Sequence, residues 1–303
     1  AHSFPTRRSS DLIYREITEI GLEESVRLWL VTAVNSFPAR AEVRGIARDL
    51  VAGLRAPWTL REAYVPGSDE LTVGHLWVWT ERTTWNPIGG IGDVYSSDIW
   101  RYIHDAPMWN HPFTGIPEAY RADFDVTTAG PEGALDVPAP AVMWNAVADR
   151  WEPVGSGTQA GSRVVFDYSA YFESTWHHGA PIDMADVVYS IVQGFELAYD
   201  VNKARIETAI GVTSRPFLET FRGFELLDEN RLAVYVDYWH FEEHLIASYA
   251  SPVGLGMPWE ILAALDDLVF EQRRAAYSDT AASRFNVPWI SLVMDRDARL
   301  VER

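Results

Sequence analysis

Apolar residues recur at helical spacing in four parts of the chain. Residues 41–54 place six apolar side chains on one face of a helix: Val43, Ile46, Ala47, Leu50, Val51 and Leu54. A second helix is expected after Asp93, whose side chain can cap it, and a third over residues 259–277. The most regular period follows Asp183, and its apolar face carries Met184, Val187, Val188, Ile191 and Phe195.

Other parts of the chain have the residue pattern of strands. The expected strand regions are residues 25–31, 71–80, 162–168 and 221–239, the last as two strands joined by a turn at Asp228–Asn230. Residues 105–160 are rich in Pro, Gly, Asp and Ala, which predicts loops with short ordered pieces. The glycines at 89–92 lack the spacing of a phosphate-binding loop and predict a flexible connection. Helices and strands alternate irregularly, so the expected fold class is α/β in a mixed (α+β) form.

The stretch WHHGAPIDMADVVYSI, which begins at Trp176, combines a turn with a helix start. Gly179 and Pro181 favour the turn. Asp183 stands where a side-chain oxygen can cap the first helical turn, and Asp186 follows three positions later, as in a capping box. Both aspartates are therefore expected to start a helix rather than to do chemistry.

The adjacent His177 and His178 raise the question of a metal site. In an extended segment their side chains point to opposite faces. A zinc site needs several converging ligands, and no third ligand is spaced to join them. We therefore expect no metal and no other cofactor.

The composition excludes several classes of function. The chain has 303 residues and a net charge of −18, which disfavours nucleic acid as a partner. It has no cysteine, which excludes disulfides, thiolate metal sites and a cysteine nucleophile. No apolar run approaches the ~20 residues that span a bilayer. The 13 tryptophans suit stacking on sugars or filling of side-chain pockets, although most are expected in the core.

The first twelve residues differ in character from the rest, because they are basic and polar in an acidic chain. They lack the apolar segment and the cleavage site of a signal peptide. Residues His2 to Leu12 match the in-frame translation of a sequencing-library adapter. We therefore expect residues 1–12 to be an artefact that is extended, disordered and without packing partners.

The stretch from Trp176 to Ser190 resembles the signature of the family 5 solute-binding proteins of ABC importers. That pattern is aromatic-His-Asp-Gly-x-Pro-x-Thr-Ala-x-Asp-Val-Val-x-Ser. The residues that match it in register are Trp176, His177, Gly179, Pro181, Asp186, Val187, Val188 and Ser190. His178 replaces the usual Asp, Met184 replaces Ala, and Asp183 replaces a Thr that could also cap.

The resemblance extends over residues 71–260 and implies a lobe of the type II periplasmic-binding-protein kind. Residues 13–70 are similar to a segment that precedes this lobe in some long members, as part of a preceding lobe or an insertion. Residues 261–303 would then be the truncated start of a following segment, and the two-lobed architecture would be incomplete. The turn Gly-Thr-Gly-Pro-Tyr that enters the second lobe of the family has no counterpart.

The function that the resemblance implies is passive capture of peptides or oligosaccharides outside the cytoplasm, for delivery to ABC permease subunits in the membrane. Binding residues concentrate on loops, so the candidate ligand contacts are Arg82, Trp85, Asn86 and Trp109. Trp77 and Trp79 share one strand face and are expected in the core.

Two other classes of function stay open. A Trp-rich, acidic carbohydrate-active enzyme of the glycoside hydrolase type would use two carboxylates. However, no nucleophile elbow, phosphate loop or metal triad is present, so no catalytic residues are expected. A structural or adhesion module is disfavoured by the mixed pattern of helices and strands.

Overall fold

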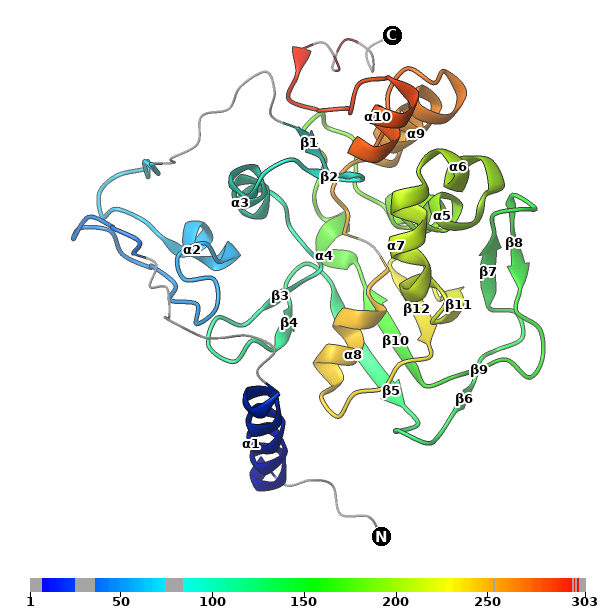
Figure 1. Ribbon diagram of the computed structural model, residues 1–303, viewed down its shortest axis with the longest axis horizontal. Helices are drawn as coiled ribbons and strands as arrows, with labels where there is room; N and C mark the ends of the chain where they lie inside the picture. Colours follow the sequence, from blue (N-terminus) through cyan, green and yellow to red (C-terminus); the bar gives the residue numbers. More distant parts are fainter. Residues whose placement is uncertain are drawn as a thin grey trace. The chain divides into compact units, whose positions relative to one another are not determined.

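The computed structural model describes residues 7–24, 36–74, 84–252, 254–295, 297 and 299. The chain forms two compact units, residues 1–40 and residues 41–303. The first contains helix α1 (Arg7–Glu23), and the second contains the other elements that the structure describes (Figure 1). The second unit mixes helix and sheet, as the sequence predicts.

The largest sheet has six antiparallel strands in the order β5–β10–β12–β11–β7–β8. Their bounds are β5 (Asp123–Thr128), β7 (Val142–Asn145), β8 (Arg150–Pro153), β10 (Ser162–Asp167), β11 (Phe221–Leu226) and β12 (Arg231–Val236). The strand expected at 162–168 is confirmed as β10, and the strand pair expected in 221–239 is confirmed as β11 and β12.

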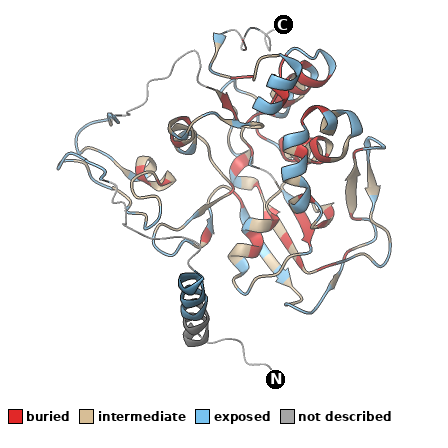
Figure 2. Cartoon of the chain, in the orientation of Figure 1, coloured by how far each residue is buried: buried red, intermediate tan, exposed pale blue. Residues whose placement is uncertain are grey.

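Helices α5 (Met184–Tyr199), α7 (Thr208–Leu218) and α8 (Glu243–Ala250) pack on one face of this sheet and share a core with it. Alternate side chains of the central strands enter that core: Val164, Phe166, Leu232, Val234 and Val236. Figure 2 shows the buried residues along these strands and helices. Burial of each such side chain contributes roughly 1.5–3 kcal/mol, so this layer is the main source of stability.

A second core joins α6 (Val201–Ile206) to α9 (Trp259–Asp266) and to Tyr277, whereas helix α10 (Asp279–Phe285) packs in a separate small cluster with Ala276. Helix α9 continues as a turn of π-helix, η1 (Asp267–Glu271). The helix expected over 259–277 is thus confirmed only as far as residue 271. It stops there because Arg273 adopts a left-handed backbone, with φ +56°.

Shorter elements complete the second unit: α2 (Pro57–Glu62), β1 (Trp85–Asn86), β2 (Gly90–Ile91), α3 (Val94–Ile103), β3 (Met108–Asn110), β4 (Pro117–Ala119), β6 (Leu135–Asp136), β9 (Gln159–Ala160) and α4 (Ser169–Phe172). The expected cap of α3 is confirmed, because the Asp93 side chain accepts a hydrogen bond from the Ser96 amide at 2.8 Å. The loop-rich region 105–160 contains short strands, as predicted.

The turn between β1 and β2 is held against the C-terminal part of the chain, where the sequence predicted a flexible connection. The Trp85 amide donates to Ser291 Oγ at 3.0 Å, and Asn86 Nδ2 donates to the Tyr277 carbonyl at 3.0 Å. A Cβ at Gly89 would lie 1.6 Å from that same carbonyl oxygen. Position 89 therefore needs glycine because the Tyr277 backbone approaches it closely, and not because the turn has to be flexible.

The helix predicted over residues 41–54 is wrong. This segment forms turns and isolated bridges, with Leu50 76% and Val51 96% exposed. Gly45 and Gly53 have positive φ, and a Cβ at Gly45 would lie 2.0 Å from the Glu62 carbonyl oxygen. Left-handed glycines and this close contact override the helical spacing of the apolar residues.

The expectation of an extended leader is wrong for residues 7–12, which belong to α1. They contain no Gly or Pro, so a helix formed by the residues after them can propagate backwards. Residues 1–6 and the strand expected at 25–31 lie outside the described residues. Of the strand expected at 71–80, residues 75–80 also lie outside them, and residues 71–74 have no regular structure. The domain boundaries expected at residues 70 and 260 stay predictions; the second of them falls inside α9.

Candidate functional site

The signature stretch forms a tight turn that leads into α5. The Trp176 amide donates to the Ala180 carbonyl at 2.8 Å, and the Gly179 amide donates back to the Trp176 carbonyl at 2.8 Å. Gly179 has φ +93°, a conformation that favours glycine. Pro181 then pairs with Thr175 in an isolated bridge.

Asp183 and Asp186 form the predicted capping box. Asp183 accepts from the Ala185 amide at 2.8 Å, while Asp186 accepts from the Asp183 amide at 3.1 Å. Asp186 also accepts from Trp176 Nε1 at 3.1 Å and from the Trp259 amide at 2.8 Å. Burial raises the pKa of Asp186, and these hydrogen bonds oppose that rise. Asp186 therefore ties the turn, α5 and α9 together, and Ser190 Oγ adds a bond to the Asp186 carbonyl at 2.8 Å.

The predicted apolar face of α5 needs one correction. Val187 and Ile191 are buried, at 0% and 3% exposed, but Val188 is only half-buried. The buried face also includes Phe195 and Ala198, so it is centred on Val187 rather than on Val188. His177 and His178 are both exposed, and the described residues contain no group of three acidic or histidine side chains arranged to hold a metal ion.

The four predicted ligand contacts fall in different surroundings. Arg82 lies outside the described residues. Trp85 and Asn86 are buried at 5% and 2% exposed, and the Asn86 side chain also accepts from the amides of the β1–β2 turn. Trp109 is half-buried on β3. A ligand role for these residues stays a prediction, and Trp109 is the one of the three described that is itself partly exposed.

Trp109 belongs to a group that we call the Trp109 cluster, made of Trp58, Arg61, His104, Trp109 and Tyr120. The Arg61 guanidinium carbon lies 5.4 Å from the Trp109 ring centroid and 5.6 Å from that of Tyr120. The Trp58 and Tyr120 rings meet edge to face at 5.6 Å, and those of His104 and Trp109 at 6.5 Å. The Arg61 side chain is only 13% exposed and its terminal nitrogens donate to three backbone carbonyls and to Asp105, so the cluster offers aromatic faces to a ligand that stacks.

His104 is held neutral within this cluster. Burial lowers its pKa below 6.5, against the raising effect of its hydrogen bond to the Gly254 carbonyl. The His104 ring stacks on Trp100 at 4.8 Å between centroids. The cationic charge of the cluster at neutral pH therefore comes from Arg61.

Two arginines share one carboxylate beside the Trp109 cluster. Arg61 lies 3.0 Å and Arg121 lies 3.5 Å from oxygens of Asp105. Within the described part of the chain, Trp109 Nε1 and Arg121 Nε are buried donors that lack a hydrogen-bond partner. Buried donors are nearly always paired, so these two are exceptions among the described residues, as are Trp144 Nε1 and the Tyr168 hydroxyl in the main core.

Sequence reasoning missed Trp58, Arg61 and Tyr120. They lie in α2 and after β4, two segments in which no motif marks a ligand contact. Only the high number of tryptophans hinted at a cluster of this kind.

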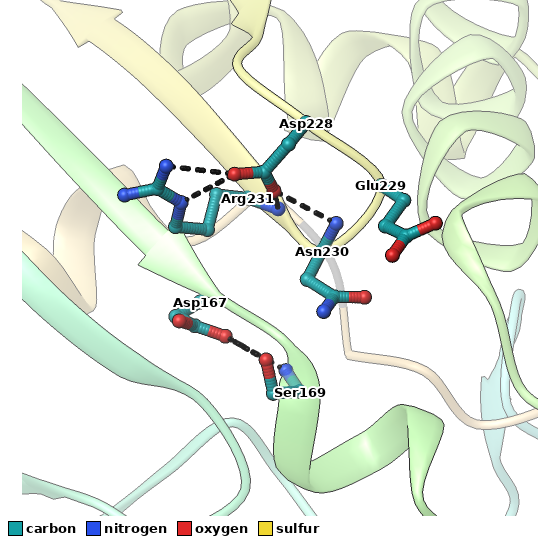
Figure 3. A pocket seen from close by; sticks show the side chains of 6 residues that line it. All are labelled: Asp167, Ser169, Asp228, Glu229, Asn230 and Arg231. Carbon is teal, nitrogen blue, oxygen red and sulfur yellow. Dashed lines mark hydrogen bonds and ion pairs between the residues drawn. The ribbon is translucent and has the colours of Figure 1, made fainter.

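A shallow pocket of about 430 Å³ lies at the tip of the β11–β12 hairpin (Figure 3). Asp228 accepts from the Asn230 and Arg231 amides and from Arg231 Nε, at 2.7–3.0 Å. Ser169 Oγ donates to Asp167 at 2.5 Å. These side chains stabilise the turn and the end of β10, so their hydrogen bonds are structural.

Two buried carboxylates also have structural partners. Asp266 accepts from the hydroxyls of Tyr189 at 2.9 Å and Tyr277 at 2.6 Å, and from Gln193 Nε2 at 2.9 Å. Glu207 accepts from the Tyr277 amide at 2.7 Å and from Ser278 Oγ at 2.5 Å. Both are buried, and the bonds join α5, α6 and α7 to the C-terminal helices, so neither carboxylate is placed to attack a substrate.

No family model matches the chain, and no curated protein matches it. Within the described ranges, no helix combines the length and the apolar character that a membrane span requires.

Proposed function

We propose that the chain is an extracytoplasmic substrate-binding component of an ABC importer, which captures peptides or oligosaccharides and delivers them to permease subunits in the membrane. On this proposal, residues 71–260 form one lobe of a type II, two-lobed binding protein. The observation that carries the proposal is the conformation of residues 176–190. Gly179 forms the turn, Asp183 and Asp186 cap the helix and Val187 is buried, whereas the signature residue Val188 is only half-buried.

The Trp109 cluster supports the same proposal by a separate route. It combines aromatic rings with a donor that has no partner among the described residues, and the buried carboxylates Asp266 and Glu207 are engaged in structural bonds. Aromatic stacking with a few directional donors is how proteins hold peptides and sugars without changing them.

The test is a titration of the protein with tri- and tetrapeptides and, separately, with oligosaccharides, followed by tryptophan fluorescence and calorimetry. Ligand that is bound and recovered intact is the expected result. Release of cleaved sugar would establish the glycoside hydrolase alternative instead. Absence of binding to either class at millimolar concentration would contradict the proposal.

Trp109→Phe tests the site itself, because it removes the Nε1 donor and keeps an aromatic ring. We expect it to weaken binding about two- to tenfold, the worth of one hydrogen bond. Trp144→Phe is the matched control, since Trp144 Nε1 is also buried without a partner in the described structure but lies against the main core. Equal loss of affinity in both variants would place the ligand elsewhere.

A further inference from the structure

Two loops of the second unit meet at their tips and expose three large apolar side chains. Residues 50–53 form one tip and residues 112–115 form the other, and we call them the apolar tips. The Leu50 amide donates to the carbonyl that precedes Phe113 at 3.0 Å, which holds the tips side by side. Leu50, Val51 and Phe113 are 76%, 96% and 60% exposed. Three such side chains at one place call for an explanation, whereas single exposed apolar residues do not.

The backbone of the first tip is closed by its own hydrogen bonds. Asp49 Oδ1 accepts from the amides of Val51 and Ala52, both at 2.7 Å. The Asp49 carbonyl accepts from the Gly53 amide at 3.1 Å, and Gly53 has φ +61°, which favours glycine. With the bond from Leu50, every amide of the first tip is paired within the chain.

The second tip is closed in the same way. His111 Nδ1 accepts from the amides of Phe113 at 3.3 Å and Thr114 at 3.2 Å. The His111 carbonyl accepts from the Gly115 amide at 2.9 Å, and Gly115 has φ +70°. Pro112 has no amide hydrogen. Both tips therefore present apolar side chains on a backbone whose amide donors need no water.

Paired amides beneath exposed apolar side chains distinguish between two kinds of partner. A protein surface is recognised partly through hydrogen bonds, and the apolar tips offer it no free amide. A lipid interface demands instead that backbone donors be paired internally, because the apolar region of a bilayer supplies no acceptor. The tips meet that demand.

The charge at the tips also fits a lipid surface. The chain has a net charge of −18, but neither tip contains an ionisable side chain. Asp49, just before the first tip, has its carboxylate engaged by two amides. Its neighbour Arg48 is exposed, and a guanidinium group at this position can pair with the phosphate of a lipid headgroup.

We propose that the apolar tips insert into the surface of a lipid bilayer, with Leu50, Val51 and Phe113 among the acyl chains and Arg48 at the phosphates. Three side chains give a weak and reversible attachment, which orients the protein on the membrane rather than anchoring it. The apolar tips share no residue with the Trp109 cluster, and the proposal does not rest on the proposed import function.

Co-sedimentation of the whole chain with phosphatidylcholine vesicles tests the proposal. We expect binding at millimolar lipid. At low salt, an equal mixture of phosphatidylcholine and phosphatidylglycerol should bind more weakly, because the net charge of −18 is repelled by an anionic surface. Absence of binding to phosphatidylcholine at millimolar lipid would overturn the proposal, and so would stronger binding to the mixture, which indicates electrostatic adsorption.

Two variants locate the contact. Val51→Ser and Phe113→Ser should each weaken vesicle binding about tenfold and leave the thermal midpoint unchanged, because both side chains are exposed in the folded chain. Phe241→Ser is the matched control, since Phe241 is 77% exposed and lies after β12, outside both tips. Equal loss of binding in all three variants would show adsorption without a defined contact and would contradict the proposal.

Pairing of two copies of the chain through the tips is the competing outcome. Sedimentation velocity would then show a concentration-dependent dimer that Val51→Ser dissociates, in a protein that does not bind vesicles. That result would assign the apolar tips to a protein interface and would exclude the membrane contact.

Discussion

At the scale of single residues, Glu207 is a wholly buried carboxyl group whose hydrogen-bond donors are uncharged groups of Tyr277 and Ser278. Burial raises its pKa above 4.5, and those hydrogen bonds oppose the rise. A raised pKa in the folded state means that the folded protein binds this proton more tightly than the unfolded chain. The stabilisation from protonated Glu207 is therefore fully present below the pKa that this group has in the unfolded chain. It is lost as the pH rises through the pKa that the group has in the folded protein.

Glu207→Gln should remove this pH dependence. We expect the difference in unfolding free energy, wild type minus variant, to fall as the pH is raised from 4.5 towards 7, measured by urea denaturation at several pH values. Glu229→Gln, at an exposed position of the β11–β12 turn, controls for the loss of one negative charge. A difference that grows with pH would show that the hydrogen bonds outweigh desolvation.

At the scale of elements, the capping box sets where α5 begins, and contact with the core determines which face of the helix is buried. Val187 is 0% exposed, whereas its neighbour Val188 is half-buried. We expect Val187→Asp to cost about 4 kcal/mol or more, because it buries an unpaired charge, and to prevent stable folding. Val188→Asp should cost only about 1–2 kcal/mol, since its carboxylate can reach water.

Thermal unfolding followed by circular dichroism separates the two variants. Equal destabilisation, or the reverse order, would mean that the buried face of α5 is centred elsewhere.

The start of α5 could be predicted because a turn and a cap are local. The Gly179 amide donates to a carbonyl three positions before it, and Asp183 and Asp186 accept from amides two and three positions away. The helix expected at 41–54 failed for the opposite reason. There the deciding contact is between Gly45 and the Glu62 carbonyl, which no local period reveals. The Trp109 cluster is likewise assembled from α2, β3 and the residues that follow α3 and β4. Its aromatic residues can be read from the sequence, but their contacts cannot.

At the scale of the whole molecule, the division into residues 1–40 and 41–303 is the main organising feature. The buried clusters of the described structure all draw their members from residues 41–303. We expect a chain that begins at Ala41 to unfold cooperatively, within about 2 °C of the midpoint of the full chain, and to bind the same ligands. Differential scanning calorimetry of both chains checks this, and a large drop in the midpoint would show that the second unit depends on the first.

The contact of the β1–β2 turn with the C-terminal segment has a consequence for synthesis of the protein. The bond from Trp85 to Ser291 spans 206 positions, and that from Asn86 to Tyr277 spans 191. A chain that leaves the ribosome from its N-terminus cannot make these two bonds until Tyr277 and Ser291 have been synthesised. The bonds of Trp85 and Asn86 to the C-terminal segment therefore form late, whereas the six-stranded sheet has all its strands available from residue 236 onwards.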